Sequence, residues 1–358
     1  MYGLRNTLEP DPADTGVGKH QSITPPLATF FTSLVLRSFN AECGLIAERK
    51  PYESEHSLGA PRKILSIAGS DSGGGAGIQA DLKTIAALGC YGLTAITALT
   101  AQNTQGVRAI HAPEPSFLGS QLSAVLDDIG ADAVKIGMLH SPEIVDVVAR
   151  LLTAYGCSNI VLDPVMIATS GDLLITPKTQ EEIVGRLFPM AAVVTPNLDE
   201  LSLLVGEPIT RPNQFEAAAR KILSMGCSAV LIKGGHLDQP QLVDVLFERV
   251  ERPTSENTLQ NPIALQVTEI TNPKIDTRNL HGTGCTLSSA IACFLAQGYP
   301  LRNAVKGGQD YVYRAIASAV TMRIDQAWNS NPQASTHAKG HGPINHGFAP
   351  QPMTLSGD

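Results

Sequence analysis

The sequence has no long apolar run, no excess of basic residues and no paired cysteines, and each absence excludes a class of protein. No apolar stretch approaches about 18 residues, the length that a membrane-spanning helix needs. The formal net charge is −7, so we expect no basic surface for nucleic acid or anionic lipid. The six cysteines form no C-x-x-C pair and no metal-type Cys/His spacing. This favours reduced thiols in a cytoplasmic protein.

The two ends of the chain lack a sustained hydrophobic period. Prolines interrupt the first 60 residues, and acids such as Glu9 and Asp11 argue against a transit peptide. No basic start followed by a long apolar region indicates a signal peptide. We therefore expect residues 1–62 to be a mostly disordered extension, residues 63–346 to form the main domain and residues 347–358 to be a loose tail.

Between these ends, short β-rich runs alternate with helical segments, which predicts an α/β fold with a mostly parallel sheet. Ser141 and Asn213 are predicted helix N-caps, and Gly89 and Gly226 follow helices as left-handed residues do. Residues 249–278 are predicted to be a surface excursion with one strand near 264–270. The other predicted strands are 64–68, 93–98, 133–136, 160–163, 192–195, 229–232 and 243–247. The predicted helices are 77–88, 115–129, 142–155, 177–187, 198–205, 215–225, 283–296 and 302–322.

The most informative stretch is His281-Gly282-Thr283-Gly284-Cys285, directly before a predicted helix. Glycines let a backbone approach a ligand closely, and the first N–H groups of a helix have no internal partner. Together with the positive end of the helix dipole, these features favour phosphate binding, although Gly282 and Gly284 are also typical of an ordinary turn. A helix start also tends to lower a thiol pKa, which makes Cys285 a candidate base. The segment indicates phosphoryl transfer.

A glycine loop follows the first predicted strand, at residues 69–77. Its spacing fits neither the P-loop nor the dinucleotide-binding fingerprint, which disfavours a dinucleotide-dependent oxidoreductase. Together with the HGTGC segment, the loop resembles the hydroxymethylpyrimidine and phosphomethylpyrimidine kinases of thiamine biosynthesis, in the ribokinase-like superfamily. The resemblance covers about residues 63–346. It also includes TAQNT (100–104), KIGML (135–139), LDPVM (162–166), TPNLDE (195–200), IKGGH (232–236) and GHGPINH (340–346).

The resemblance implies a three-layer α/β/α sandwich and a magnesium- and ATP-dependent kinase. The expected acceptors are 4-amino-5-hydroxymethyl-2-methylpyrimidine and then its monophosphate. Cys285 stands where most of the superfamily has an aspartate base, which supports this subfamily and leaves the base less certain. The resemblance implies an anion hole at Gly282 and Gly284, and nucleotide contacts from Thr283, Asn197 and Lys233. It places magnesium at Glu200, with Asp163 as a second acid.

Gln102 is the predicted substrate reader. A primary amide offers an acceptor beside a donor, which matches an aminopyrimidine, and the resemblance implies this use of the AQNT glutamine. The resemblance also implies that Met138 and Val165 line the ring faces and that Gly69 and Ala76 leave room for the ring. Ordinary core packing is nearly as good an interpretation of Met138 and Val165. We expect Asp81 to be a solvated helix acid, His281 to have no chemical role, and His341 and His346 to pack against the core.

Two other functions remain open from the sequence. A pyridoxal or pyridoxine kinase shares the fold and the cysteine-type anion hole, and a degenerate homologue would bind its vitamin or nucleotide as a sensor. The AQNT and KIGML segments favour the pyrimidine, and the intact HGTGC, N-x-x-E and Lys233 weigh against the sensor. We expect small-molecule partners only, in a monomer or a homo-oligomer. We also expect too little chain outside the kinase region for a thiamine-phosphate synthase module.

Overall fold

The computed structural model describes residues 60–167, 174–235, 241–250, 264–324 and 341–353, which contain one nine-stranded sheet with the order β3-β2-β1-β4-β5-β6-β7-β8-β9. Six neighbouring strands, β2 to β7 in that order, are parallel, and β3, β8 and β9 are antiparallel to their neighbours. The strands are β1 (Lys63–Asp71), β2 (Tyr91–Asn103), β3 (Gly106–His111), β4 (Ala133–Ile136), β5 (Ile160–Leu162), β6 (Ala191–Val194), β7 (Ala229–Ile232), β8 (Gln241–Val250) and β9 (Ala264–Pro273). The mostly parallel sheet is therefore confirmed.

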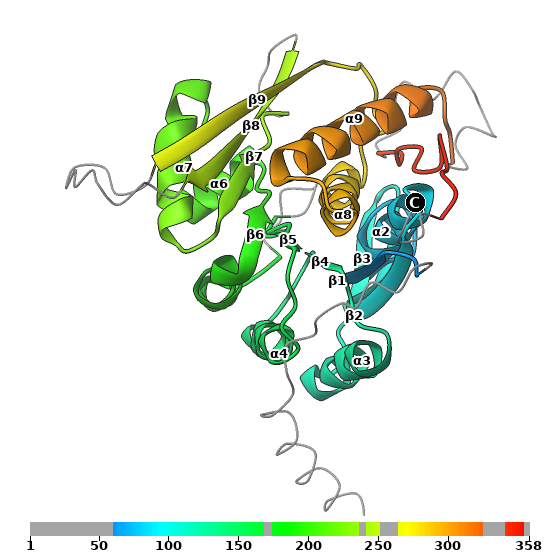
Figure 1. Ribbon diagram of the computed structural model, residues 1–358. Coiled ribbons are helices and arrows are strands. Elements are labelled where there is room, and N and C mark those ends of the chain that lie inside the picture. The colour runs from blue at the N-terminus through cyan, green and yellow to red at the C-terminus, as the bar shows by residue number, and fades with distance from the viewer. Residues whose placement is uncertain (1–59, 168–173, 236–240, 251–263, 325–340, 354–358) are drawn as a thin grey trace, which may run out of the picture. The chain divides into compact units, whose positions relative to one another are not determined.

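Helices cover both faces of this sheet, so the fold has three layers (Figure 1). One hydrophobic cluster joins the sheet to α2 (Gly77–Ala87), α8 (Thr283–Ala296) and α9 (Leu301–Ala319). The cluster on the other face includes α3 (Pro115–Asp128), α4 (Pro142–Ala154), α6 (Leu198–Val205) and α7 (Phe215–Ser224). The same cluster takes in η2 (Ile183–Leu187), which continues α5 (Pro177–Glu182). No helix in these ranges is long and apolar enough to span a membrane.

Local sequence explains most of the element boundaries. Ser141 caps α4 by accepting from the Ile144 N–H, and Gly89 and Gly226 have positive φ angles of 73° and 116° after their helices. Asn213 is not the predicted N-cap of α7, because Pro212 opens a short 3₁₀ turn (η4, Pro212–Gln214) and Gln214 takes the cap position. The strand expected near 264–270 is β9, which pairs with β8 over ten residues.

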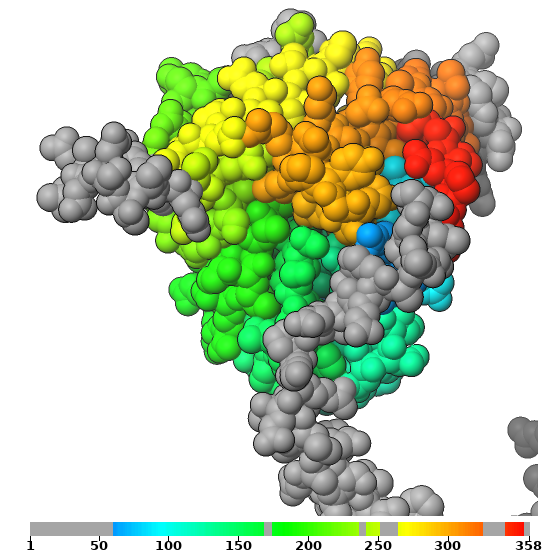
Figure 2. Space-filling model, viewed as in Figure 1, coloured from blue at the N-terminus to red at the C-terminus, as the bar shows by residue number. Residues whose placement is uncertain are grey.

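The predictions for the two ends of the chain have different outcomes. The predicted extension lies almost wholly outside the described residues, which begin at Ala60. At the other end, contacts continue beyond Gly347, where we expected a loose tail. The Phe348 ring lies 5.2 Å from the Tyr311 ring between centroids, and Gln351 N–H donates to the Ala87 carbonyl. Figure 2 shows this segment, in red, beside α9 in orange. The described part of the segment packs against α2 and α9.

Candidate active site

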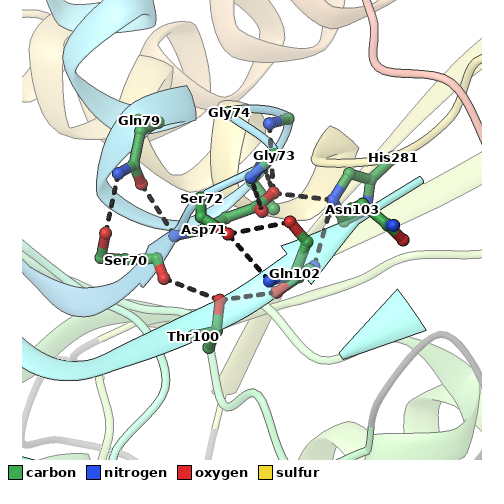
Figure 3. Close-up of polar contacts among 12 residues, drawn as sticks. Ser70, Asp71, Ser72, Gly73, Gly74, Gln79, Thr100, Gln102, Asn103 and His281 are labelled. Carbon is green, nitrogen blue, oxygen red and sulfur yellow. Dashed lines mark hydrogen bonds and ion pairs between the residues drawn. The ribbon is translucent and has the colours of Figure 1, made fainter. Parts of the chain in front are cut away.

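Gln102 lies near the end of β2, in a part of the strand that its neighbours hold firmly. The Ser72 hydroxyl donates to the Gln102 carbonyl and accepts from its N–H, both at 2.8 Å. The β2–β3 register shifts between Ala101 and Gln102, an irregularity that re-aims a side chain. The Gln102 amide then reaches Thr100 Oγ1 at 3.1 Å and His281 Nε2 at 3.4 Å (Figure 3). The structure therefore joins Gln102 to the HGTGC segment, 179 residues away in sequence.

Asp71 and His281 form the junction between the glycine loop and that segment. Asp71 accepts the backbone N–H groups of Gly73, Gly75 and Ala76, and its Oδ2 lies 2.9 Å from His281 Nε2. Burial alone would raise the pKa of Asp71, but the hydrogen bonds from His281, Ala76 and Gly73 outweigh it and lower the pKa. The carboxylate is therefore ionised, and His281, for which we expected no chemical role, is a structural partner of the site.

Three glycines occupy tight positions around the site, and one of them, Gly282, lies where the two loops touch. A Cβ on Gly282 would lie 1.8 Å from the Gly75 carbonyl oxygen, and the φ of Gly282 is +86°. A Cβ on Gly77, whose φ is +56°, would lie 2.3 Å from the Gly69 carbonyl oxygen. Gly282 is therefore needed for loop-to-loop contact as well as for its left-handed conformation. A Cβ on Gly284 would instead lie 3.4 Å from Asp163 Oδ2 and 3.5 Å from Lys233 Nζ. The side of Gly284 without a side chain therefore faces these two charged groups.

Cys285 lies in the first turn of α8, where the Gly77 N–H donates to its sulfur. The expectation of a lowered thiol pKa is wrong for this structure: burial raises the pKa of Cys285 to about 11. Lys135 and the Gly77 N–H oppose that effect, while Asp81 and Asp163 add to it. Loss of solvation outweighs the helix start, and the resting thiol is protonated at neutral pH.

Asp81 and Lys135 form a buried ion pair beneath Cys285. Both side chains are fully buried, and Lys135 Nζ lies 2.9 Å from Asp81 Oδ2. Ser66 on β1 and Ser289 on α8 also donate to the Asp81 carboxylate, at 2.6 Å and 2.8 Å. The prediction of a solvated Asp81 is therefore wrong, because its partners come from segments up to 208 residues away. Through these contacts the pair joins α2, β1, β4 and α8.

A second charged group lies at the ends of β5, β6 and β7. Lys233 Nζ donates to Asp163 Oδ1 at 3.1 Å, and the Thr195 hydroxyl donates to the same oxygen. Asn197 caps α6, with reciprocal hydrogen bonds between Asn197 and Glu200. Burial raises the pKa of Glu200; Lys233 opposes this and Asp163 adds to it. The structure thus brings Asp163, Lys233, Asn197 and Glu200 together, and their phosphate and metal roles stay predictions.

The predicted ring-lining residues stand in two groups. A Cβ on Gly69 would lie 3.1 Å from Met138 Cε, so these two residues are in contact. Ala76 precedes α2 in the glycine loop, and Val165 follows β5 two residues after Asp163. The position of Val165 is equally compatible with ordinary core packing, and its contact with a ring stays a prediction.

The C-terminal segment at 341–346 forms hydrogen bonds to two parts of the same site. His281 N–H donates to the Gly342 carbonyl at 3.0 Å, and His341 N–H donates to the Thr104 carbonyl at 3.1 Å. His346 is buried, and burial lowers its pKa to about 4, with Lys83 and His281 adding to the effect. The segment therefore links the turn after β2 to the loop before α8.

Sequence reasoning gave no role to Thr100, Asp71, His281 or Lys135. Each of them lies inside a motif that carries the family resemblance, and this was the available signal. No three His, Cys, Asp or Glu side chains cluster as a metal site would among the residues that the structure describes. A cation here would therefore take few protein ligands.

Comparison with known proteins identifies the family of this chain. Residues 71–328 match the phosphomethylpyrimidine kinase family. The hydroxymethylpyrimidine/phosphomethylpyrimidine kinase of Escherichia coli is 41% identical over 79% of this chain and 96% of its own length. The thiamine biosynthesis bifunctional protein ThiED of Geobacter sulfurreducens is 43% identical, and the matched region spans about half (52%) of it. A pyridoxal kinase from Staphylococcus aureus, solved with AMP-PCP and pyridoxal, has a TM-score of 0.66 at 31% identity, covering 81% of this chain and 94% of that one. The chain belongs to the phosphomethylpyrimidine kinase family.

Proposed function

We propose that this protein uses ATP to phosphorylate the hydroxymethyl oxygen of 4-amino-5-hydroxymethyl-2-methylpyrimidine. It then phosphorylates the monophosphate to the diphosphate, for thiamine diphosphate biosynthesis. Family membership supports the reaction class. One structural observation carries the assignment of the site: a single chain of contacts runs from Gln102 through His281 to the HGTGC segment, which faces Asp163 and Lys233.

Gln102 binds the pyrimidine in this proposal, with Met138 and Val165 against the ring and with Gly69 and Ala76 leaving room for it. The hydroxymethyl group then points toward Gly282, Gly284 and Cys285. The side of Gly284 that faces the Lys233 ammonium is the place for the transferred phosphoryl group, because the atoms nearest to an added Cβ there are the charged ends of Asp163 and Lys233, at 3.4 Å and 3.5 Å. Phosphoryl transfer depends mainly on positioning and charge neutralisation, and this arrangement supplies both.

Lys233, Thr283 and Asn197 serve the nucleotide phosphates in the same proposal. Thr283 is the first residue of α8, where backbone N–H groups lack helical partners. Lys233 holds a fixed charge: burial would lower its pKa, but Asp163 and Glu200 raise it. The ammonium therefore stays available to neutralise a phosphate.

The residues present fit a magnesium ion bound mostly by water and phosphate. Asp163 and Glu200 offer hard carboxylate oxygens, and two buried carboxylates with one lysine leave negative charge that a cation would neutralise. Magnesium, when bound, supplies charge neutralisation at the nucleotide phosphates. In the protein, Lys233 orients Asp163, and the Asn197 backbone N–H orients Glu200.

Cys285 is the proposed base that takes the hydroxymethyl proton. Because burial raises its pKa to about 11, the Cys285 thiol must first lose its own proton to water, and the thiolate then accepts the hydroxymethyl proton. Lys135 and the Gly77 N–H are the groups on the protein that favour the thiolate. Because the chemistry needs little general-base assistance, a small fraction of thiolate suffices.

The decisive assay measures ATP consumption and product formation with three acceptors: the hydroxymethylpyrimidine, its monophosphate and pyridoxal. We expect turnover of both pyrimidines and a lower kcat/KM for pyridoxal. Pyridoxal kinase is the second candidate, because the S. aureus pyridoxal kinase shares the fold. A preference for pyridoxal would replace the proposed function with that one, and nucleotide binding without turnover of any acceptor would indicate a sensor. The proposal includes a cytoplasmic location, in a monomer or a homo-oligomer.

A further inference from the structure

The side-chain amide of Gln102 has two ends of equal size, so its hydrogen-bond partners decide which end is the nitrogen. Two side chains contact it: Thr100 Oγ1 lies 3.1 Å from the atom assigned as Gln102 Oε1, and His281 Nε2 lies 3.4 Å from the atom assigned as Gln102 Nε2 (Figure 3). The hydrogen bonds around the amide favour the reverse assignment of these two atoms. The backbone of Gln102 is fixed by Ser72, so these two contacts set the orientation of the amide.

The His281 contact calls for the amide oxygen. Asp71 Oδ2 lies 2.9 Å from His281 Nε2, and an ionised carboxylate only accepts hydrogen bonds. Nε2 therefore carries a hydrogen, which it donates to Asp71. A ring nitrogen that carries a hydrogen cannot accept a hydrogen bond from an amide N–H. The Gln102 oxygen is therefore the more favourable atom to face it.

The Thr100 contact independently calls for the amide nitrogen. The Thr100 hydroxyl has one hydrogen, and the Ser70 carbonyl oxygen lies 2.9 Å from it. Once that hydrogen is donated to Ser70, the oxygen of Thr100 can only accept. The end of Gln102 at 3.1 Å is then a donor. With the nitrogen toward Thr100 and the oxygen toward His281, Thr100 accepts while it donates to Ser70, and the ring N–H faces an acceptor. In the reverse orientation the Thr100 hydroxyl must donate to Gln102 in place of Ser70, and two N–H groups face each other.

We propose that Thr100 and His281 are positioning residues that hold the Gln102 amide with its nitrogen toward Thr100 and its oxygen toward His281, and that this order selects an aminopyrimidine. In the substrate, a ring nitrogen, an amino-bearing carbon and the hydroxymethyl-bearing carbon follow one another. The Gln102 nitrogen donates to the ring nitrogen, and its oxygen accepts from the amino group. Because the oxygen lies on the His281 side, the hydroxymethyl group comes next to the HGTGC segment.

The same order acts against a pyridine aldehyde. There an aldehyde oxygen takes the place of the amino group beside the hydroxymethyl-bearing carbon, and it would face the Gln102 oxygen. Two acceptors without a hydrogen between them repel, and the buried groups stay unpaired. This selection rests on the proposed function, whereas the orientation of the amide does not.

The orientation is tested without substrate by neutron diffraction of the deuterium-exchanged protein. We expect deuterium on the Gln102 atom that faces Thr100 and on His281 Nε2. Deuterium on the Gln102 atom that faces His281 would overturn the proposal, as would a bare Nε2. The result establishes the orientation of the amide whether or not the proposed function is correct.

The selection is tested by kinetics with a matched pair of variants. Thr100→Val removes the acceptor and should raise the pyrimidine KM about tenfold, the cost of roughly one hydrogen bond, with the KM for ATP unchanged. Thr100→Ser keeps the hydroxyl and should resemble the parent. In a Gln102→Leu background, Thr100→Val should have no further effect. If Thr100→Val raises the pyrimidine KM equally with and without Gln102→Leu, Thr100 acts only through the Ser70 carbonyl. If Thr100→Val leaves the preference for the pyrimidine over pyridoxal unchanged, Thr100 has no role in selecting the substrate.

Discussion

At the residue scale, Gln102 carries the proposed recognition of the pyrimidine. Gln102→Leu keeps the size of the side chain but leaves the buried amino group and ring nitrogen unpaired, at about 1–3 kcal/mol for each lost partner. The apparent affinity for the pyrimidine should fall while the affinity for ATP changes little. Steady-state KM values for both substrates check this. Equal losses for both substrates, or no loss, would place Gln102 outside the substrate site.

Cys285 allows a sharper test, because its thiol pKa is raised to about 11. At pH values below this pKa, the thiolate fraction grows about tenfold for each unit by which the pH rises. If the thiolate is the base, the single-turnover rate should rise with pH through the neutral range and slow about 10²–10⁴-fold in Cys285→Ala, with ATP binding preserved. Cys285→Ser should be impaired nearly as much, and Cys285→Asp should retain some activity.

The measurement for Cys285 is the pH profile of single-turnover phosphorylation in each variant, with nucleotide affinity taken separately. Cys285→Ala should lose the pH dependence along with the rate. Parent-like turnover in Cys285→Ala would remove the base assignment. Catalysis would then rest on the glycines, Lys233 and magnesium, with the proton lost to water or to the phosphate.

At the element scale, Gly282 shows why two loops can meet before α8. Gly282→Ala must adopt a φ of +86° and also place a Cβ against the Gly75 carbonyl. Gly298 is a matched control, since its φ is +88° but nothing lies within 4 Å of an added Cβ. Gly298→Ala should cost about 1–2 kcal/mol of unfolding free energy and no activity. Gly282→Ala should cost more and lower kcat/KM, as denaturant unfolding and kinetics will show; equal effects of the two would mean that the loops separate freely.

The buried pair of Asp81 and Lys135 joins four elements below the site. Lys135→Met leaves an uncompensated buried carboxylate and should lower the free energy of unfolding by about 3–5 kcal/mol. Lys135→Met with Asp81→Asn removes both charges and should recover much of that loss. Arg150→Met breaks an exposed ion pair with Asp146 and should cost at most about 1 kcal/mol. A double variant as unstable as Lys135→Met alone would show that charge compensation is not what Lys135 provides.

The same elements show what the sequence can predict. Strands such as Ala133–Ile136 and helices such as Leu198–Val205 are predicted correctly, because a buried run or a cap and an apolar face mark them locally. Strand β3 was missed, since all six of its side chains are exposed and no alternation marks it. Among site residues, the motifs indicate Gln102 and Cys285. The partners of Asp81 and Asp71 lie up to 210 residues away, and no local pattern reveals them.

At the scale of the whole molecule, the described part of the chain from Lys63 to Gln351 contains the sheet, both helical layers and every proposed site residue. The family match begins at Asp71, inside β1. Within the described ranges, the contacts that build the site join residues from Ser66 onward. The predicted extension, with its prolines and absent hydrophobic period, is therefore expected to add nothing to the active site.

Deleting residues 1–60 should leave folding and both kinase activities nearly intact. Deleting residues 341–358 is the contrasting change, because it removes the bonds from His281 to Gly342 and from His341 to Thr104 that fasten the two sides of the site. That second deletion should lower activity sharply and destabilise α9, which loses its contact with Phe348. Thermal unfolding and turnover of the hydroxymethylpyrimidine and its monophosphate check both truncations. If the protein that lacks residues 1–60 is insoluble or inactive, the extension belongs to the core or to an oligomer contact.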